Sequence, residues 1–147
     1  FGVYAVNSLR MEKAYKGWGA ELTNEITLVE ADMERFFGGN KNDFTGKSAT
    51  LKARDNGIST KLVYLDVEPG DSDVVGGEAV LDGDRPIGVT TSGAYGHATA
   101  KSLGFAYVEP KYTAPGATFD IVLLGDRRKA TVIADPVWDP ANERLRS

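Results

Sequence analysis

The sequence predicts an α+β fold in which two leading helices are followed by a small antiparallel, Greek-key-like β-barrel. In roughly the first third of the chain, apolar residues recur at spacings of three and four, as on the packed face of a helix. From residue 61 onward, short runs alternate between apolar and other residues, and turns containing Gly or Pro separate them. Five or six such strands would expose long edges in an open sheet, so we expect them to close into a barrel.

The composition is that of an ordinary globular protein with many turns. Of the 147 residues, 41% are apolar and 26% are charged, and the chain has 17 Gly and 6 Pro. The net charge is -4 and no long basic run is present, so we do not expect a nucleic-acid partner. No stretch has the length of an apolar membrane span, and the absence of Cys excludes disulfides and thiolate chemistry.

The first helix is predicted around residues 7–19. We expect it to end near Gly17 or Gly19, because glycine accepts the left-handed backbone that closes many helices. The helical spacing puts Tyr4, Ser8, Met11, Tyr15 and Trp18 on one face. A stripe of this kind is typical of a helix face that packs into a core.

A second helix is predicted to begin at Thr27. Thr27 and Glu30 have the spacing of a capping box, in which a hydroxyl and a carboxylate satisfy free backbone donors reciprocally. One face of this helix would carry Val29, Met33, Phe36 and Phe37, and the helix should end at residues 38–40. A shorter linker helix is predicted over residues 46–54, before the turn at residues 55–57.

The strands are predicted from period-two alternation. The first covers residues 61–67, and a hairpin follows, with strands at 78–81 and 87–91 and a turn at 82–86. Further strands are predicted at 103–108, 119–123 and 129–134. Between them, Ala114-Pro115-Gly116 has the residues of a type II turn.

Three strings of residues, in order, resemble motifs of one protein family. Residues 7–19 read NSLRMEKAYKGWG, residues 43–47 read DFTGK, and residues 88–93 read GVTTSG and are followed by KSLGFAYV at 101–108. The chain resembles the C-terminal part of glycine-cleavage T-proteins (aminomethyltransferases) and of dimethylglycine and sarcosine dehydrogenases. The resemblance implies that residues 1–42 end a folate-binding domain, residues 43–57 form a linker helix, and residues 58–147 form a C-terminal barrel domain.

The resemblance implies a folate-dependent activity for the parent protein. In this family tetrahydrofolate accepts a one-carbon unit from an N-methyl amine such as dimethylglycine or sarcosine, or from a glycine-cleavage intermediate. FAD would belong to an absent N-terminal domain. We expect partners limited to folate, the amine and the missing N-terminal domains, with no membrane partner. The location would be cytoplasmic, or the mitochondrial matrix in a eukaryote. The fragment alone would be inactive. The alternative is a non-catalytic folate-binding regulator or a barrel that packs domains.

Four residues are candidate folate contacts, and no catalytic residue is assigned. Arg10 and Glu12 could hydrogen-bond a pterin ring and Tyr15 could stack on it, although an ion-paired helix with a packed aromatic edge also accounts for them. Arg35 aligns with a folate-contacting Tyr of the dimethylglycine dehydrogenases. Its guanidinium could donate to the glutamate tail of folate or could simply be solvated, and both interpretations remain open.

Other motifs are interpreted as structural. His97 is the only histidine and has no partner for a metal site or a catalytic triad nearby, so we expect a surface turn residue. The acidic pairs Asp71, Asp73, Asp82 and Asp84 lack the pattern of a calcium loop. Residues 46–48 read GKS, but position 41 is Lys41 where a P-loop requires Gly.

Overall fold

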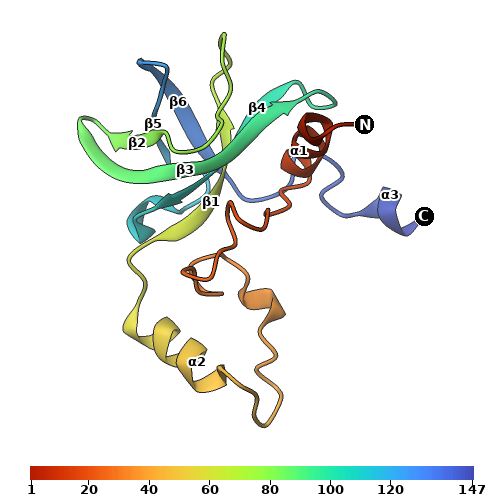
Figure 1. Cartoon of the computed structure of the whole chain (residues 1–147), viewed down its shortest axis with the longest axis vertical. Helices are drawn as coiled ribbons and strands as arrows, with labels where there is room; N and C mark the ends of the chain where they lie inside the picture. The colour runs from red at the N-terminus through yellow and green to blue at the C-terminus, as the bar shows by residue number, and fades with distance from the viewer.

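The computed structural model describes all residues from 1 to 147 and shows a six-stranded barrel beside an N-terminal segment (Figure 1). The strands are β1 (Lys61–Val67), β2 (Ala79–Asp82), β3 (Arg85–Gly96), β4 (Lys101–Val108), β5 (Thr118–Leu123) and β6 (Asp126–Ile133). They form a closed barrel in the order β1-β4-β3-β2-β5-β6, and all neighbours are antiparallel. Strands β2, β3 and β4 are successive neighbours and β1 lies beside β4, which is a Greek key. The predicted fold class is confirmed.

Strand β1 is buried on both faces. Val63, Leu65 and Val67 belong to the main core of the barrel, while Leu62 and Tyr64 belong to a second apolar cluster. Successive side chains of a strand point to opposite faces, so the second cluster lies on the outer side of the barrel wall. Its buried members are Met11, Leu62, Tyr64, Leu103, Phe105 and Tyr107. The outer cluster is the surface on which the N-terminal segment packs.

Helix α1 (Val3–Glu12) lies against β3 and is shorter than predicted. Asn7 Nδ2 donates to the Gly93 carbonyl at 2.8 Å. The helix ends at Glu12, well before Gly17, because Ala14 takes the left-handed conformation with φ 52°. The predicted core stripe is also wrong in part: Met11 is fully buried, but Tyr4 is 93% exposed.

The α-helix predicted from Thr27 is wrong. The capping-box contacts form, since Thr27 N donates to Glu30 Oε2 at 2.9 Å. However, the chain continues as turns and a single 3₁₀ helix, η1 (Glu34–Phe36). Asp32 adopts φ 53°, and carbonyls of this stretch bind Lys16 and the backbone of β1 rather than the next helical turn. The short helix predicted over residues 46–54 is confirmed as α2 (Lys47–Asn56), so two α-helices precede the barrel.

The remaining elements follow the predicted pattern. The β2–β3 hairpin forms, with Gly83 at φ 60° in its turn, and Gly116 has φ 85° in the predicted type II turn. His97 lies exposed in the turn after β3, as predicted. Two short helices, η2 (Pro110–Tyr112) and α3 (Glu143–Arg146), complete the chain. None of the helices combines the length and apolarity needed to cross a bilayer.

Candidate functional site

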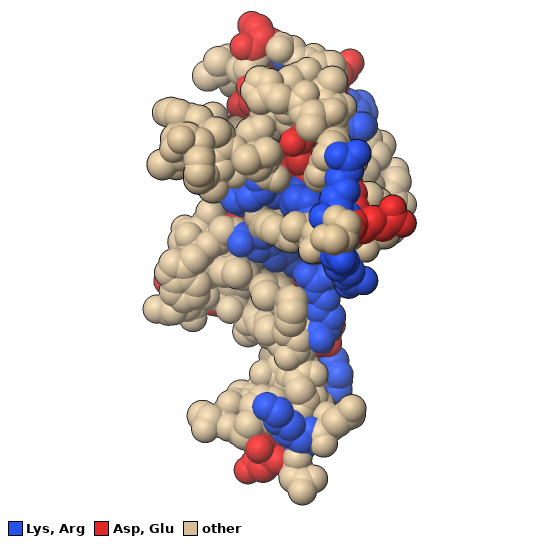
Figure 2. Space-filling view, turned by 90° about the vertical axis from the view of Figure 1, so that its right-hand side faces the viewer, with Lys and Arg blue, Asp and Glu red and all other residues tan.

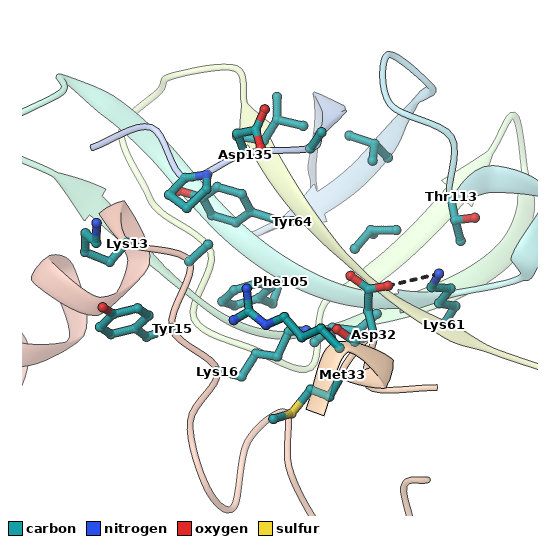
Figure 3. Close-up of a pocket in the computed structure, with 18 of the residues that line it drawn as sticks. Lys13, Tyr15, Lys16, Asp32, Met33, Lys61, Tyr64, Phe105, Thr113 and Asp135 are labelled. Atoms are coloured by element: carbon teal, nitrogen blue, oxygen red, sulfur yellow. Dashed lines mark hydrogen bonds and ion pairs between the residues drawn. The ribbon is translucent and has the colours of Figure 1, made fainter. Parts of the chain in front are cut away.

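A cleft of about 820 Å³ separates the N-terminal segment from the outer wall of the barrel (Figure 3). Its walls come mainly from three parts of the chain: residues 13–16 and 32–36 of the N-terminal segment, residues 61–64 of β1, and, near the C-terminus, residues 132–136 with Pro140 and Asn142. A cleft of this size accommodates a ligand the size of a cofactor. Because three distant segments meet here, this is the candidate binding site.

Aromatic side chains line one side of the cleft. The rings of Tyr64 and Phe105 lie 5.2 Å apart between centroids in a tilted arrangement. The Tyr64 hydroxyl donates to the Met11 carbonyl at 2.6 Å. Burial raises the pKa of Tyr64, so this hydroxyl stays protonated and anchors the end of α1 to the barrel. Tyr15, which is half exposed, adds a third aromatic ring to the cleft from the N-terminal segment.

Basic side chains also line the cleft. Lys16 Nζ donates to the carbonyls of Ala31 at 2.6 Å and Asp32 at 2.8 Å. Lys61 Nζ lies 3.0 Å from Asp32 Oδ1, whereas Arg35 is exposed and has no carboxylate partner. Burial lowers the pKa of Lys16. The charge of Asp32 opposes this change, and the charges of Arg35 and Lys61 lower the pKa further.

The four predicted contact residues divide into two pairs. Tyr15 and Arg35 line the cleft. Arg10 and Glu12 do not, and both are used to hold α1 in place. The Arg10 guanidinium binds Glu21 at 3.2 Å, while the buried Glu12 carboxylate accepts from Thr99 N at 2.8 Å. Sequence reasoning missed Lys16 and Lys61 as cleft residues, because isolated lysines give no signal without the fold.

Glu21 was also missed and is the centre of a buried polar network. Its side chain is fully buried, and its carboxylate accepts from Gly17 N at 2.7 Å and Thr91 Oγ1 at 2.7 Å, and from Ser92 Oγ and Arg10. A buried carboxylate with this many donors is well compensated. It fixes the segment after α1 to β3 and thereby sets the position of the cleft wall.

The C-terminal tail after β6 forms the third wall of the cleft. Hydrogen bonds hold this tail against the C-terminal end of α1. Trp138 N donates to the Glu12 carbonyl at 3.0 Å. Lys13 Nζ donates to the Asp139 carbonyl at 2.8 Å and to Asn142 Oδ1 at 2.7 Å. A cation bound to groups beyond a helix C-terminus also interacts favourably with the helix dipole.

Comparisons with known proteins agree with this architecture. Mouse mitochondrial dimethylglycine dehydrogenase is 39% identical over 148 residues, which cover 99% of this chain and 17% of that protein. A probable aminomethyltransferase from Pyrococcus horikoshii is 30% identical, with coverage of 95% of this chain and 37% of that protein. The chain therefore spans well under half the length of these relatives.

A solved structure has the same fold. The aminomethyltransferase T of the glycine cleavage system from Bartonella henselae matches with a TM-score of 0.83 and 24% identity, over 92% of this chain and 38% of that one. The profile of the glycine cleavage T-protein C-terminal barrel domain matches residues 60–139, which include all six strands. The chain belongs to the glycine cleavage T-protein C-terminal barrel family, as its motifs predicted.

Proposed function

We propose that this chain forms one wall of the folate site in a tetrahydrofolate-dependent one-carbon transfer enzyme. The substrate would be an N-methyl amine such as dimethylglycine or sarcosine, or a glycine-cleavage intermediate. One observation carries the proposal: in a chain of this family, the segment that resembles the end of a folate-binding domain and the barrel together enclose a cleft with aromatic and basic walls.

The residues of the cleft fit the chemistry of a folate. Tyr15, Tyr64 and Phe105 offer aromatic surface for its ring systems, and Lys16 and Arg35 offer positive charge for its carboxylates. Bound tetrahydrofolate would supply amine nitrogens that accept a one-carbon unit. The residues of this chain would bind and orient the ligand and exclude water from one side.

The predicted contact residues take two roles in this proposal. Tyr15 and Arg35 would touch the ligand, because both line the cleft. Arg10 and Glu12 would act as positioning residues, because their charged groups are bound to Glu21 and Thr99. We assign no catalytic acid or base to this chain.

The same proposal gives the domain organisation. Residues 1–42 would complete a folate-binding domain and residues 58–147 would form the barrel domain. Residues 43–57 would form the linker helix between these two domains. FAD would bind another domain of an oxidoreductase parent. The location would be the cytoplasm, or the mitochondrial matrix in a eukaryote; the name of the mouse relative describes that protein as mitochondrial.

A second candidate is a non-catalytic module, either a barrel that packs domains or a folate-binding regulator. It is favoured by the exposed apolar side chains on and near α1, which need a partner surface: Phe1, Val3, Tyr4, Leu9 and Trp18. In the enzyme proposal, the rest of the folate-binding domain covers them.

The test uses the full-length product of the gene. Calorimetry should show saturable binding of tetrahydrofolate, and incubation with tetrahydrofolate, dimethylglycine or sarcosine, and an electron acceptor should form methylenetetrahydrofolate. Folate binding without turnover on these amines or on a glycine-cleavage intermediate would favour the regulator. An absence of folate binding would contradict the enzyme proposal and leave a packing module.

A further inference from the structure

We propose that the C-terminal segment, residues 138–147, is a movable strap that Lys13 latches against the end of α1, and that its release opens one side of the cleft. The strap supplies Pro140 and Asn142 to the cleft wall. A ligand would enter and leave while the strap is released and would be retained while it is latched. The inference goes beyond the proposed function, and only the choice of tetrahydrofolate as a probe rests on that function.

The strap has few contacts with the rest of the structure. The last strand, β6, ends at Ile133, and no residue beyond it is buried. Val137 packs against the outer cluster, whereas the residues after it pair with no strand. Figure 1 shows α3 standing away from the barrel, on the side where α1 lies. Because a segment with so little burial opens more readily than a barrel strand, the strap can move with Val137 as its pivot.

Lys13 is the latch because its ammonium group binds the strap at three points. Its Nζ donates to the Asp139 carbonyl at 2.8 Å and to Asn142 Oδ1 at 2.7 Å, and lies 3.6 Å from Asp139 Oδ2. An ammonium group has three donors, so these contacts use its full capacity. The side chains of Lys13 and Asp139 are only 13% and 9% exposed, so solvent screens their ion pair weakly. Lys13 directly follows the last residue of α1, so the strap is fastened to the end of that helix.

Asp139 connects the latch to the conformation of the strap. Its carbonyl also accepts from Asn142 N at 2.9 Å, and its carboxylate accepts from Glu143 N at 2.8 Å. Asp139 has φ 46° although Pro140 follows it. A left-handed backbone is uncommon outside Gly, and the residue before a Pro prefers an extended chain. The contacts of Asp139 therefore hold a disfavoured backbone conformation, and without them we expect the chain to extend and carry the strap off the cleft.

The charge of the surrounding surface favours the latched arrangement. Figure 2 looks onto the side of the molecule where α1 and α3 lie, and it shows Lys and Arg gathered in a band down that side. A carboxylate such as that of Asp139 is attracted to a surface of this kind. Within the strap, the Arg144 guanidinium lies 5.0 Å from the centre of the Trp138 ring, so the strap also has a contact of its own that can persist when the latch is released.

Hydrogen exchange of the full-length gene product tests whether the strap opens as one unit. Lys13→Met removes the ammonium group and keeps an unbranched side chain. It should speed the exchange of all the hydrogen-bonded strap amides by about tenfold, as expected for the loss of hydrogen bonds to a charged group. Fragmentation mass spectrometry resolves these amides, which are Trp138 N, Asn142 N and Glu143 N. Trp138 N is the diagnostic one, because it donates to the Glu12 carbonyl and Lys13 does not bind it.

Two further variants assign the effect to the latch. Asp139→Ala breaks the latch from the side of the strap and should also speed the exchange of Trp138 N, although Asp139 does not line the cleft. Arg146→Gln removes an exposed charge of the strap that forms no ion pair, and should behave like the wild type. Exchange of Trp138 N that stays unchanged in both Lys13→Met and Asp139→Ala would overturn the strap, because the tail would then fray residue by residue.

Stopped-flow binding of tetrahydrofolate tests whether the strap controls access to the cleft. If the ligand passes only through the released form and the latch re-forms over it, Asp139→Ala should raise the association and dissociation rate constants by the same factor. The Kd should then stay within about twofold of the wild-type value. A fixed wall that only contacts the ligand would change the dissociation rate constant alone, and that result would overturn the control of access.

The outcomes keep this inference separate from the proposed function. Tetrahydrofolate binding with unchanged exchange of Trp138 N in the variants would overturn the strap and leave the folate proposal standing. A failure of tetrahydrofolate to bind the wild type would contradict the folate proposal, and the exchange of Trp138 N would still decide whether the strap opens.

Discussion

Replacing Glu21 by Ala should detach the N-terminal segment from the barrel. The carboxylate is fully buried and accepts hydrogen bonds from the Arg10 guanidinium, Gly17 N and the hydroxyls of Thr91 and Ser92. Alanine leaves all four donors without this acceptor. Removing one partner of a buried ion pair costs about 3–5 kcal/mol, because the other charge remains buried and unpaired.

The expected magnitude lies at the low end of that range. The Arg10 side chain is 19% exposed, so water can reach its guanidinium in the variant. We therefore expect Glu21→Ala to lower the free energy of unfolding by about 3 kcal/mol, which corresponds to a melting temperature roughly 6–12 °C lower. Glu21→Gln keeps an acceptor but loses the charge, and should cost less, about 1 kcal/mol.

Urea unfolding and hydrogen exchange measure the effect. Exchange should accelerate in residues 1–37 more than in the barrel strands, since the network joins the two. Glu25→Ala is the matched control, because Glu25 is an exposed carboxylate of the same loop and its substitution should change stability by less than about 0.5 kcal/mol. A Glu21→Ala variant as stable as this control would refute the argument.

Two further predictions concern the contacts that hold the cleft walls and the β2–β3 region. Gly96→Ala would place a Cβ atom 2.7 Å from Glu12 Cγ, so calorimetric melting should show a loss of about 1–3 kcal/mol, and an unchanged melting temperature would contradict the close approach. For Glu78, burial alone would raise the pKa, but hydrogen bonds from Thr90 Oγ1 and from the N–H groups of Val75 and Gly76 lower it. The stability that Glu78 contributes is therefore full above the ordinary pKa of 4.5 and is lost as the pH falls through the lowered value. Melting temperatures measured from pH 6 to pH 3 should fall less for Glu78→Gln than for the wild type, and parallel curves would contradict this.

The barrel could be predicted because its signals are local. Alternation along residues 61–67 and glycines at turns such as Gly83 depend on each segment's own geometry, and both predictions are confirmed. The absence of an α-helix after Thr27 could not be predicted from such local signals. The capping box formed, but Lys16 binds the carbonyls that would continue the helix, and that contact depends on the tertiary fold.

The residues of the candidate site could also be predicted only in part, because some of their contacts depend on the tertiary fold. Tyr15 and Arg35 could be selected from the sequence through the family resemblance, and both line the cleft. Glu21 could not be selected, since its partner Thr91 is 70 residues away and no spacing rule connects them. Arg10 was singled out for its chemistry, but the structure shows that its guanidinium binds Glu21 instead of lining the cleft.

The most direct test of the central claim, that the cleft is a wall of the folate site, is hydrogen exchange of the full-length gene product with and without saturating tetrahydrofolate. We predict slower exchange in residues 13–16, 32–36, 61–64 and 132–135, which line the cleft, and unchanged exchange in the β2–β3 hairpin. Protection confined to other parts of the protein, with the cleft residues unchanged, would contradict the account.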